Sequence, residues 1–300
     1  MRIERRAAVL GGMTVALTLA LAGCSAGGEA TETSQQDRTA VSSLVNTPPE
    51  LQTAVDQVAR ECLVSQGFAV PPIVGSNWRA YISPTGLTGL MPTVELAKQQ
   101  GYTSTIKGNS NWADTFRATL APKQAAAFDV AYAPVDGPHE SVTLESGTQA
   151  SRASTGCNAD GQKAVYGSVK TGLEIDMFVN EVLSQGDNAA TQQLVGQLIG
   201  DYESCMKSKG YQVSGLHASD LAKKEFGTYR QPGQQPSAAE SKMAGTDADC
   251  QAQSGLTSRV DGDYFNKAAS WIKNHESMIV ARQESLNDSL ARAKKILENG

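Results

Sequence analysis

The sequence contains few aromatic residues, few histidines and, beyond its N-terminus, no long hydrophobic run. Aromatic residues make up 6% of the 300 residues, and there are 3 histidines. A membrane-spanning helix needs about 20 consecutive apolar residues, so nothing downstream of the N-terminal stretch is expected to cross a bilayer. With 40% hydrophobic and 19% charged residues, the composition is typical of one or two soluble globular domains.

Motifs of metal and catalytic chemistry are also missing. His139, His217 and His275 each stand alone, so no metal site and no cofactor is expected. An S-x-x-K at 204–207 and a K-T-G at 170–172 occur in the reverse of the order that penicillin-recognising serine enzymes require. We therefore expect a non-catalytic protein more than an enzyme, although the sequence leaves its biochemical activity undecided.

The N-terminus has the three parts of a secretory signal. Arginines at positions 2, 5 and 6 precede an apolar run over 7–20, and the tetrapeptide L-A-G-C follows at 21–24. This resembles the lipobox of bacterial lipoproteins. The resemblance implies removal of residues 1–23, lipidation of Cys24 and attachment to the outer face of the cell membrane. Sec and Tat export both stay open, and an ordinary cleaved signal with an incidental Cys24 is the alternative.

The expected mature chain is acidic. Removing residues 1–23 takes away three arginines and one glutamate, so the formal net charge falls from −5 to −7. Nucleic-acid binding depends on clusters of lysine and arginine that neutralise phosphates, and such clusters are lacking here. The sequence therefore excludes nucleic acid as an expected partner.

Four cysteines besides Cys24 are spread over the chain: Cys62, Cys157, Cys205 and Cys250. An even number of cysteines in an oxidising compartment indicates two disulfides. Free reactive thiols or a zinc site are disfavoured, because the sequence has no C-x-x-C and no histidine near any cysteine.

Two of these cysteines lie in similar local sequences. Cys62 and Cys205 are each followed by glycine at +5, an aromatic residue at +6 and valine at +8, which indicates a divergent internal repeat. Each cysteine would lie near the end of an amphipathic helix, with the glycine in a left-handed conformation after it. If each repeat closes on itself, Cys62 pairs with Cys157 and Cys205 with Cys250. The two crossed pairings stay open, because connectivity does not follow strictly from sequence.

Composition divides the expected mature chain into a tether and two halves. Residues 24–46 are rich in small and polar side chains and are expected to be a flexible tether. Residues 47–170 are expected to form a loop-rich helical first repeat. Residues 171–300 are expected to form a helical second repeat with a long C-terminal helix, packed as one unit with the first. The predicted fold class is mainly α, a disulfide-stapled helical domain.

Capping residues and apolar periodicity predict individual elements. They predict helices over 47–66, 93–100 and 122–132, an exposed loop over 134–156, and further helices ending at 184, spanning 188–209, following 219 and starting at 237.

A seven-residue apolar repeat marks the C-terminus. Phe265, Ile272, Ile279, Leu286 and Ala293 recur at this spacing, so one helix is expected over about 263–298. We expect it to pack onto the 173–209 helices of the same chain, which predicts a monomer. A coiled coil between chains is the alternative.

Four motifs of the chain carry a family resemblance. They are the segments 122–128, 156–167, 205–211 and 243–250, the last before the long C-terminal helix. This pattern resembles a group of uncharacterised secreted lipoproteins from actinobacteria. The resemblance implies a helical, two-disulfide extracytoplasmic domain, and it supplies no activity, ligand or site residue.

Two tryptophans stand in polar segments. Trp78 follows Asn77 and Trp112 follows Asn111. An exposed tryptophan beside asparagine suits contact with a sugar or a protein partner. The alternative is that both rings are buried, because a chain with few aromatic residues needs its large side chains inside.

The segment 261–263 begins like a calcium-binding loop. Such a loop needs a bidentate glutamate at its twelfth position, where this chain has Ile272. We therefore interpret Asp261 and Asp263 as residues of a helix N-terminus, where negative charge complements the helix dipole.

Together these features predict a membrane-anchored extracytoplasmic lipoprotein with a non-catalytic binding or scaffolding role at the cell envelope. The expected partners are the membrane, through the lipid on Cys24, and an envelope protein or polysaccharide. An envelope-acting hydrolase of unknown substrate is the alternative. A concave pocket with converging titratable groups would favour the hydrolase.

Overall fold

The computed structural model describes residues 33–73, 81–107, 111–231 and 233–299, which are mainly helical, as predicted. They belong to one unit, Thr31–Gly300. The helices are α1 Gln35–Val45, α2 Pro49–Ser65, α3 Val94–Gln100, the 3-10 helix η1 Thr103–Thr105, α4 Trp112–Arg117, α5 Pro122–Tyr132, α6 Cys157–Tyr166, α7 Val169–Ser184, α8 Asn188–Ser208, α9 Ala218–Phe226, α10 Ala238–Gln253, α11 Leu256–Asn274 and α12 Glu276–Asn299. Strands β1 His139–Thr143 and β2 Gln149–Ala153 form an antiparallel hairpin.

Many helix starts follow local capping signals. The side chains of Thr93, Ser168, Asp187 and Ser237 accept hydrogen bonds from backbone N–H groups three residues later, at the starts of α3, α7, α8 and α10. These bonds satisfy donors that a helix start leaves without an intrahelical partner. The predicted bounds of α2, α3, α5 and α8 and the predicted start of α10 are closely confirmed.

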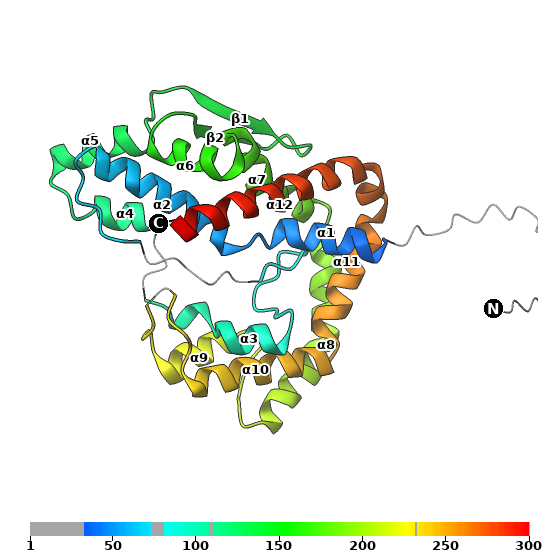
Figure 1. Ribbon diagram of the computed structural model, residues 1–300. Coiled ribbons are helices and arrows are strands. Elements are labelled where there is room, and N and C mark those ends of the chain that lie inside the picture. Colours follow the sequence, from blue (N-terminus) through cyan, green and yellow to red (C-terminus); the bar gives the residue numbers. More distant parts are fainter. Residues whose placement is uncertain (1–32, 74–80, 108–110, 232, 300) are drawn as a thin grey trace, which may run out of the picture. The chain divides into compact units, whose positions relative to one another are not determined.

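One hydrophobic cluster lies among α1, α2, α6, α7, α11 and α12 (Figure 1). Within it α12 packs along α1, α2 and α6. The heptad residues Ile272, Ile279, Leu286 and Ala293 are all buried there. The apolar stripe of the C-terminal segment therefore faces helices of the same chain.

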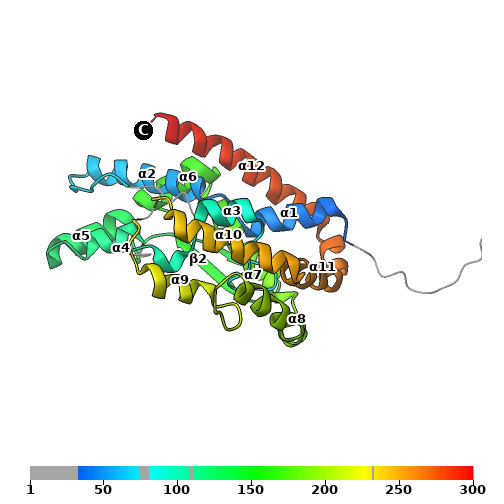
Figure 2. The same cartoon turned by 90° about the horizontal axis from the view of Figure 1, so that it is seen from below.

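A second cluster joins α3, α8, α9, α10 and the first turns of α11. Here α3 from the predicted first repeat lies beside α10 from the predicted second repeat (Figure 2). Met243 and Ala244 of α10 and Ala97 of α3 are buried between them. Side chains from both halves of the sequence thus share one core.

A third cluster gathers α4, α5, the end of α2 and the start of α6. Phe128 is at its centre. Its ring packs edge-on against Phe68 at 5.8 Å and stacks on Tyr132 at 5.4 Å between ring centroids. Most of the described aromatic residues of the first half belong to this cluster, and Tyr81 and Tyr102 belong to the second.

Both predicted disulfides are confirmed. Cys62 is bonded to Cys157 with 5.5 Å between Cα atoms, and Cys205 to Cys250 with 5.6 Å. The first bond joins the end of α2 to the first residue of α6. The second joins the end of α8 to the last turns of α10.

The expectation of a flexible tether over 24–46 is wrong for residues 35–45, which form α1. The Ser34 side chain caps the helix by accepting from the Asp37 N–H. Val41, Leu44 and Val45 lie on one face and are buried in the first cluster. Residues 24–32 of the expected tether, and the signal peptide 1–23, lie outside the described residues.

The C-terminal segment is two helices rather than one. The predicted long C-terminal helix is present as α12, but α11 ends at Asn274 and α12 begins at Glu276. The seven-residue repeat runs across this break because residues of both helices face the same cluster. The expected packing onto the 173–209 helices is confirmed for α11, which packs on α8, but is wrong for α12, which packs mainly on α1, α2 and α6.

The expected exposed loop over 134–156 contains the β1–β2 hairpin. Its pairing places His139 opposite Ala153 and Thr143 opposite Gln149. Most side chains of both strands are exposed, with Ala153 buried. Polar, half-exposed strands give only a weak sequence signal, because little apolar alternation is left to mark them.

Candidate functional site

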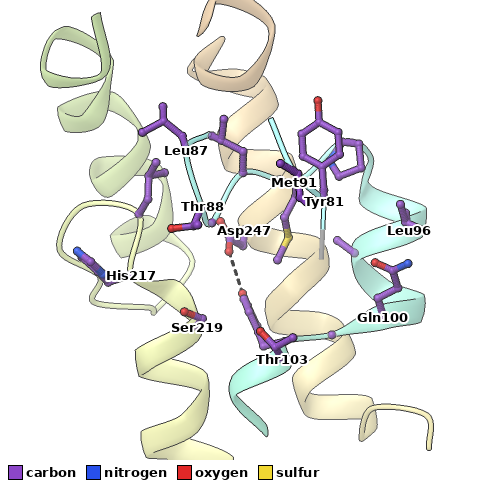
Figure 3. A pocket seen from close by; sticks show the side chains of 18 of the residues that line it. Tyr81, Leu87, Thr88, Met91, Leu96, Gln100, Thr103, His217, Ser219 and Asp247 are labelled. Carbon is purple, nitrogen blue, oxygen red and sulfur yellow. Dashed lines mark hydrogen bonds between the residues drawn. The ribbon is translucent and has the colours of Figure 1, made fainter. Parts of the chain in front are cut away.

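Segments far apart in the sequence enclose a cavity of about 290 Å³ in the second cluster (Figure 3). Its walls are the loop 81–92, residues 96–103 of α3 and the following turn, and residues 216–219 at the start of α9. Asp247 of α10 lies between these walls. The apolar lining includes Leu87, Leu90, Met91, Leu96 and Leu216.

The Asp247 carboxylate is buried and accepts hydrogen bonds from three side chains. Tyr102 donates to Oδ2 at 3.0 Å, and Tyr202 and Gln251 each donate to Oδ1 at 2.8 Å. Burial raises the pKa of Asp247, and the hydrogen bonds from Gln251, Tyr202 and Tyr102 offset part of this rise. The carboxylate thus ties the turn after α3 to α8 and α10.

Gln251, one turn further along α10, holds the loop that forms one wall. Its Oε1 accepts the Met91 N–H at 2.9 Å, and its Nε2 donates to the Gly89 carbonyl at 2.8 Å. The backbone at Gly89 also approaches the segment just before α9 closely. A Cβ at this position would lie 2.6 Å from the Leu216 carbonyl oxygen, so only glycine fits there.

Asp261 of α11 holds the start of the same loop. Its carboxylate accepts from the Tyr81 hydroxyl at 2.7 Å and from the Ser83 hydroxyl at 2.6 Å. Burial raises the pKa of Asp261, and the bonds from Ser83 and Tyr81 counteract it. The interpretation of Asp261 and Asp263 as N-terminal helix residues is wrong, because α11 begins at Leu256.

A buried ion pair supports the wall that follows α3. Arg230 Nη2 lies 3.1 Å from Glu240 Oε1, and the two side chains are 2% and 0% exposed. The same guanidinium donates to the carbonyls of Gln100 and Tyr102, and Glu240 accepts the Tyr102 N–H at 2.8 Å. Each buried charge therefore has several hydrogen-bond partners, as burial of ions requires.

His217 and Ser219 stand at the mouth of the cavity (Figure 3). His217 Nδ1 lies 3.5 Å from Asp220 Oδ2, with the two side chains 72% and 76% exposed. Serine, histidine and aspartate are the residue types of a hydrolase triad. Here the imidazole and the carboxylate face water, and the described hydrogen bonds include none from Ser219 to His217. The described contacts therefore do not include the serine–histidine hydrogen bond that marks an activated nucleophile.

The four disulfide cysteines and Trp112, which the sequence singled out, are not among the described residues that line the cavity. Cys24 and Trp78 are outside the described residues. Trp112 opens α4 and packs edge-on against Tyr132, 5.7 Å between ring centroids, in the third cluster. Its ring is half-buried, which fits the interpretation of a packing role better than that of an exposed contact. Within the described ranges, no group of three or more His, Cys, Asp or Glu could hold a metal ion.

Local sequence patterns do not identify the residues that shape the cavity. None of Asp247, Tyr102, Tyr202 and Gln251 is predicted as a site residue from the sequence. The available signal was a carboxylate and an amide four residues apart on an otherwise apolar helix face. Their partners lie up to 162 residues away, so no local pattern joins them.

Away from the cavity, a histidine, a glutamate and a tryptophan interact at the break between α11 and α12. His275 Nε2 is 2.5 Å from Glu145 Oε1, and Trp271 Nε1 donates to Glu145 Oε2 at 3.0 Å. His275 Nδ1 is 2.7 Å from the Trp271 carbonyl oxygen. Because both ring nitrogens face acceptors, the protonated imidazolium suits this setting best. Burial lowers the pKa of His275, but the bonds to Trp271 and Glu145 outweigh it and raise the pKa.

Comparisons with family models, curated proteins and solved structures found no match to this chain. The resemblance to actinobacterial lipoproteins therefore stays a prediction. Among the helices of the described residues, none combines the length and apolar character that crossing a membrane requires.

Proposed function

We propose that this protein is a membrane-anchored extracytoplasmic lipoprotein with a non-catalytic binding role at the cell envelope. The observation that carries the binding role is the cavity beside Asp247, whose lining is largely apolar. The one buried carboxylate among its described lining residues is already held by Tyr102, Tyr202 and Gln251. A buried carboxylate with these three partners holds the walls of the cavity together, whereas a general base must reach a proton of the substrate.

The proposed location rests on two further features. The L-A-G-C tetrapeptide at 21–24 follows a charged and an apolar segment, which is the order of a lipoprotein signal. The two disulfides are typical of proteins that fold outside the reducing cytosol.

The anchor is tested with Cys24→Ala in cells supplied with an alkyne-tagged fatty acid. Wild-type protein should carry the label and sediment with membranes. The variant should be unlabelled and should remain as precursor or be misplaced, because the acylated thiol is gone. Cys62→Ala/Cys157→Ala is the matched control, since it removes cysteines without touching the signal and should keep the label. Equal labelling of wild type and Cys24→Ala would overturn the anchor.

The binding role without catalysis is tested at the mouth of the cavity. Ser219→Ala should leave every envelope-related phenotype of the gene intact, since Ser219 is proposed to do no chemistry. Filling the cavity with Thr88→Trp should abolish the same phenotypes. A phenotype lost in Ser219→Ala and retained in Thr88→Trp would favour a hydrolase instead.

A further inference from the structure

The charges around the cavity restrict what it can hold. Its described lining includes no lysine or arginine, its one histidine, His217, is 72% exposed at the mouth, and the Asp247 carboxylate is 1% exposed. An anionic ligand would be desolvated beside this carboxylate without a cation to compensate it, which is strongly unfavourable. A cationic ligand would need an accessible acceptor, but the Asp247 carboxylate is buried and already accepts three hydrogen bonds from the protein.

The lining has an apolar body and a neutral polar margin. Leu87, Met91 and Leu216 present aliphatic surface from two walls. Hydroxyl and amide groups of Thr88, Gln100 and Thr103 surround them (Figure 3). Binding pockets commonly combine a mostly apolar wall with a few polar groups that set orientation.

The cavity is held in shape without a ligand. The loop 81–92 is fixed at its start by Asp261 and near its end by Gln251. The opposite wall is fixed by the Arg230–Glu240 pair. A preformed pocket spends little binding free energy on ordering its walls. At about 290 Å³, it is at the small end of ligand pockets, which span roughly 300–1,000 Å³.

We propose that this cavity binds an uncharged, mainly apolar small molecule of about one or two rings, or an aliphatic group of similar bulk, carrying at most a neutral hydroxyl or amide. This inference rests on the proposed binding function and names the chemical class of the ligand. Apolar contact with the leucine and methionine side chains supplies the affinity, and the polar margin orients the neutral group.

The test uses two probes with the same ring system and different charge, 2-naphthol and naphthalene-2-sulfonate. The full-length protein is labelled with ¹³C at its methionine methyl groups, because Met91 lines the cavity while Met206 and Met243 are buried in the core and serve as references. In wild type, 2-naphthol should shift the Met91 signal saturably. The sulfonate should bind at least about tenfold more weakly, equivalent to about 1.4 kcal/mol.

Four variants distinguish binding in the cavity from binding elsewhere on the protein. Thr88→Trp and Leu216→Trp fill it from two walls and should each abolish the Met91 shift. Val130→Trp on α5 introduces the same side chain at a residue 68% exposed and should retain the shift. Thr88→Lys adds a cation at the mouth and should let the sulfonate bind. Using two filling variants guards against one of them failing to fold.

Three outcomes would overturn the ligand class: the sulfonate binding wild type as well as the naphthol, the naphthol shift surviving both filling variants, or no shift with either probe. The anchor and the absence of catalysis are tested by the Cys24 and Ser219 variants. A failure of the ligand class is thereby distinguishable from a failure of the proposed function.

Discussion

Gly67 and Gly210 end α2 and α8 with the same backbone geometry. Their φ angles are 90° and 92°. In both cases the next residue, an aromatic one, donates its N–H to a carbonyl five residues back: Phe68 to Leu63 at 3.1 Å and Tyr211 to Met206 at 3.0 Å. This is the hydrogen bond of a Schellman cap. The sequence echo around Cys62 and Cys205 is therefore also a structural echo.

Alanine at either glycine should destabilise the protein, since a left-handed backbone disfavours a Cβ by about 1–2 kcal/mol. Neither position has a neighbour within 4 Å of an added Cβ, so the backbone strain alone is measured. Urea unfolding of the Gly67→Ala and Gly210→Ala variants measures the loss in the free energy of unfolding at each position. Gly196→Ala in α8 is the matched control. Its added Cβ also meets nothing, and it should stabilise the helix by about 0.5–1 kcal/mol. Equal effects at all three positions would contradict the shared cap.

Removing the disulfides should have unequal effects. The bonded cysteines are 95 residues apart in the first bridge and 45 in the second. In the chain-entropy model, the Cys62→Ala/Cys157→Ala pair should cost about 4.7 kcal/mol and the Cys205→Ala/Cys250→Ala pair about 4.0 kcal/mol. Urea unfolding of the two double variants measures both. A peptide joining Cys62 to Cys205 in a non-reducing digest of wild type would contradict the pairing itself.

Ile279 of α12 should be a residue of the protein's own core. It is 1% exposed in the first cluster, so Ile279→Ala should lower the free energy of unfolding by about 2–5 kcal/mol through lost burial and a new cavity. Val280, its neighbour, is 46% exposed, and Val280→Ala should change stability by less than about 0.5 kcal/mol.

The packing of α12 also predicts that the protein is a monomer. A monomer melts at a temperature independent of protein concentration, whereas a dimer becomes more stable as concentration rises. We expect the melting temperature of wild type to stay constant over a roughly hundredfold dilution series, because α12 packs on its own chain. A melting temperature that climbs with concentration would identify an interface between chains.

The His275–Glu145 pair should make stability depend on pH. The pKa of His275 is raised in the fold, so its contribution is fully present below the unfolded value of 6.5 and is lost as pH rises through the folded value. Hydrogen bonds from Trp271 and His275 lower the pKa of Glu145, so its contribution is present above its unfolded value of 4.5 and is lost as pH falls through the folded one. The pair should therefore stabilise most near pH 6.

Glu145→Gln isolates this effect because it removes the charge but keeps an acceptor for Trp271. At pH 6 the substitution should lower the free energy of unfolding by about 0.2–1 kcal/mol, the range of exposed ion pairs. At pH 8.5 the loss should be smaller. NMR titration should show a lower pKa for His275 in the variant. Glu140→Gln, on β1 of the same hairpin, is the control and should leave the His275 titration unchanged. An unaltered His275 pKa in Glu145→Gln would contradict the pairing.

Local signals predicted the elements that depend on neighbours along the chain. Pro122 at the start of α5, and the side chains of Thr93 and Ser237 that cap α3 and α10, act within one turn of a helix, so their effect can be found without tertiary information. The helix α1 also had such a signal in Ser34, Asp37 and the spacing of Val41, Leu44 and Val45. It was outweighed by the small polar residues around it.

The sequence by itself determined the helical class and the helix-ending glycines, and the echo around Cys62 and Cys205 favoured the disulfide pairing that the structure shows. Tertiary structure alone decided that α1 packs against α12, that the C-terminal segment breaks into two helices at His275, and that Asp247, Tyr102 and Tyr202 meet beside a cavity. The physical reason is the range of the interactions. A cap or a helix face is made by residues within a few positions, whereas the cavity forms from chain segments whose contact depends on how every helix between them packs.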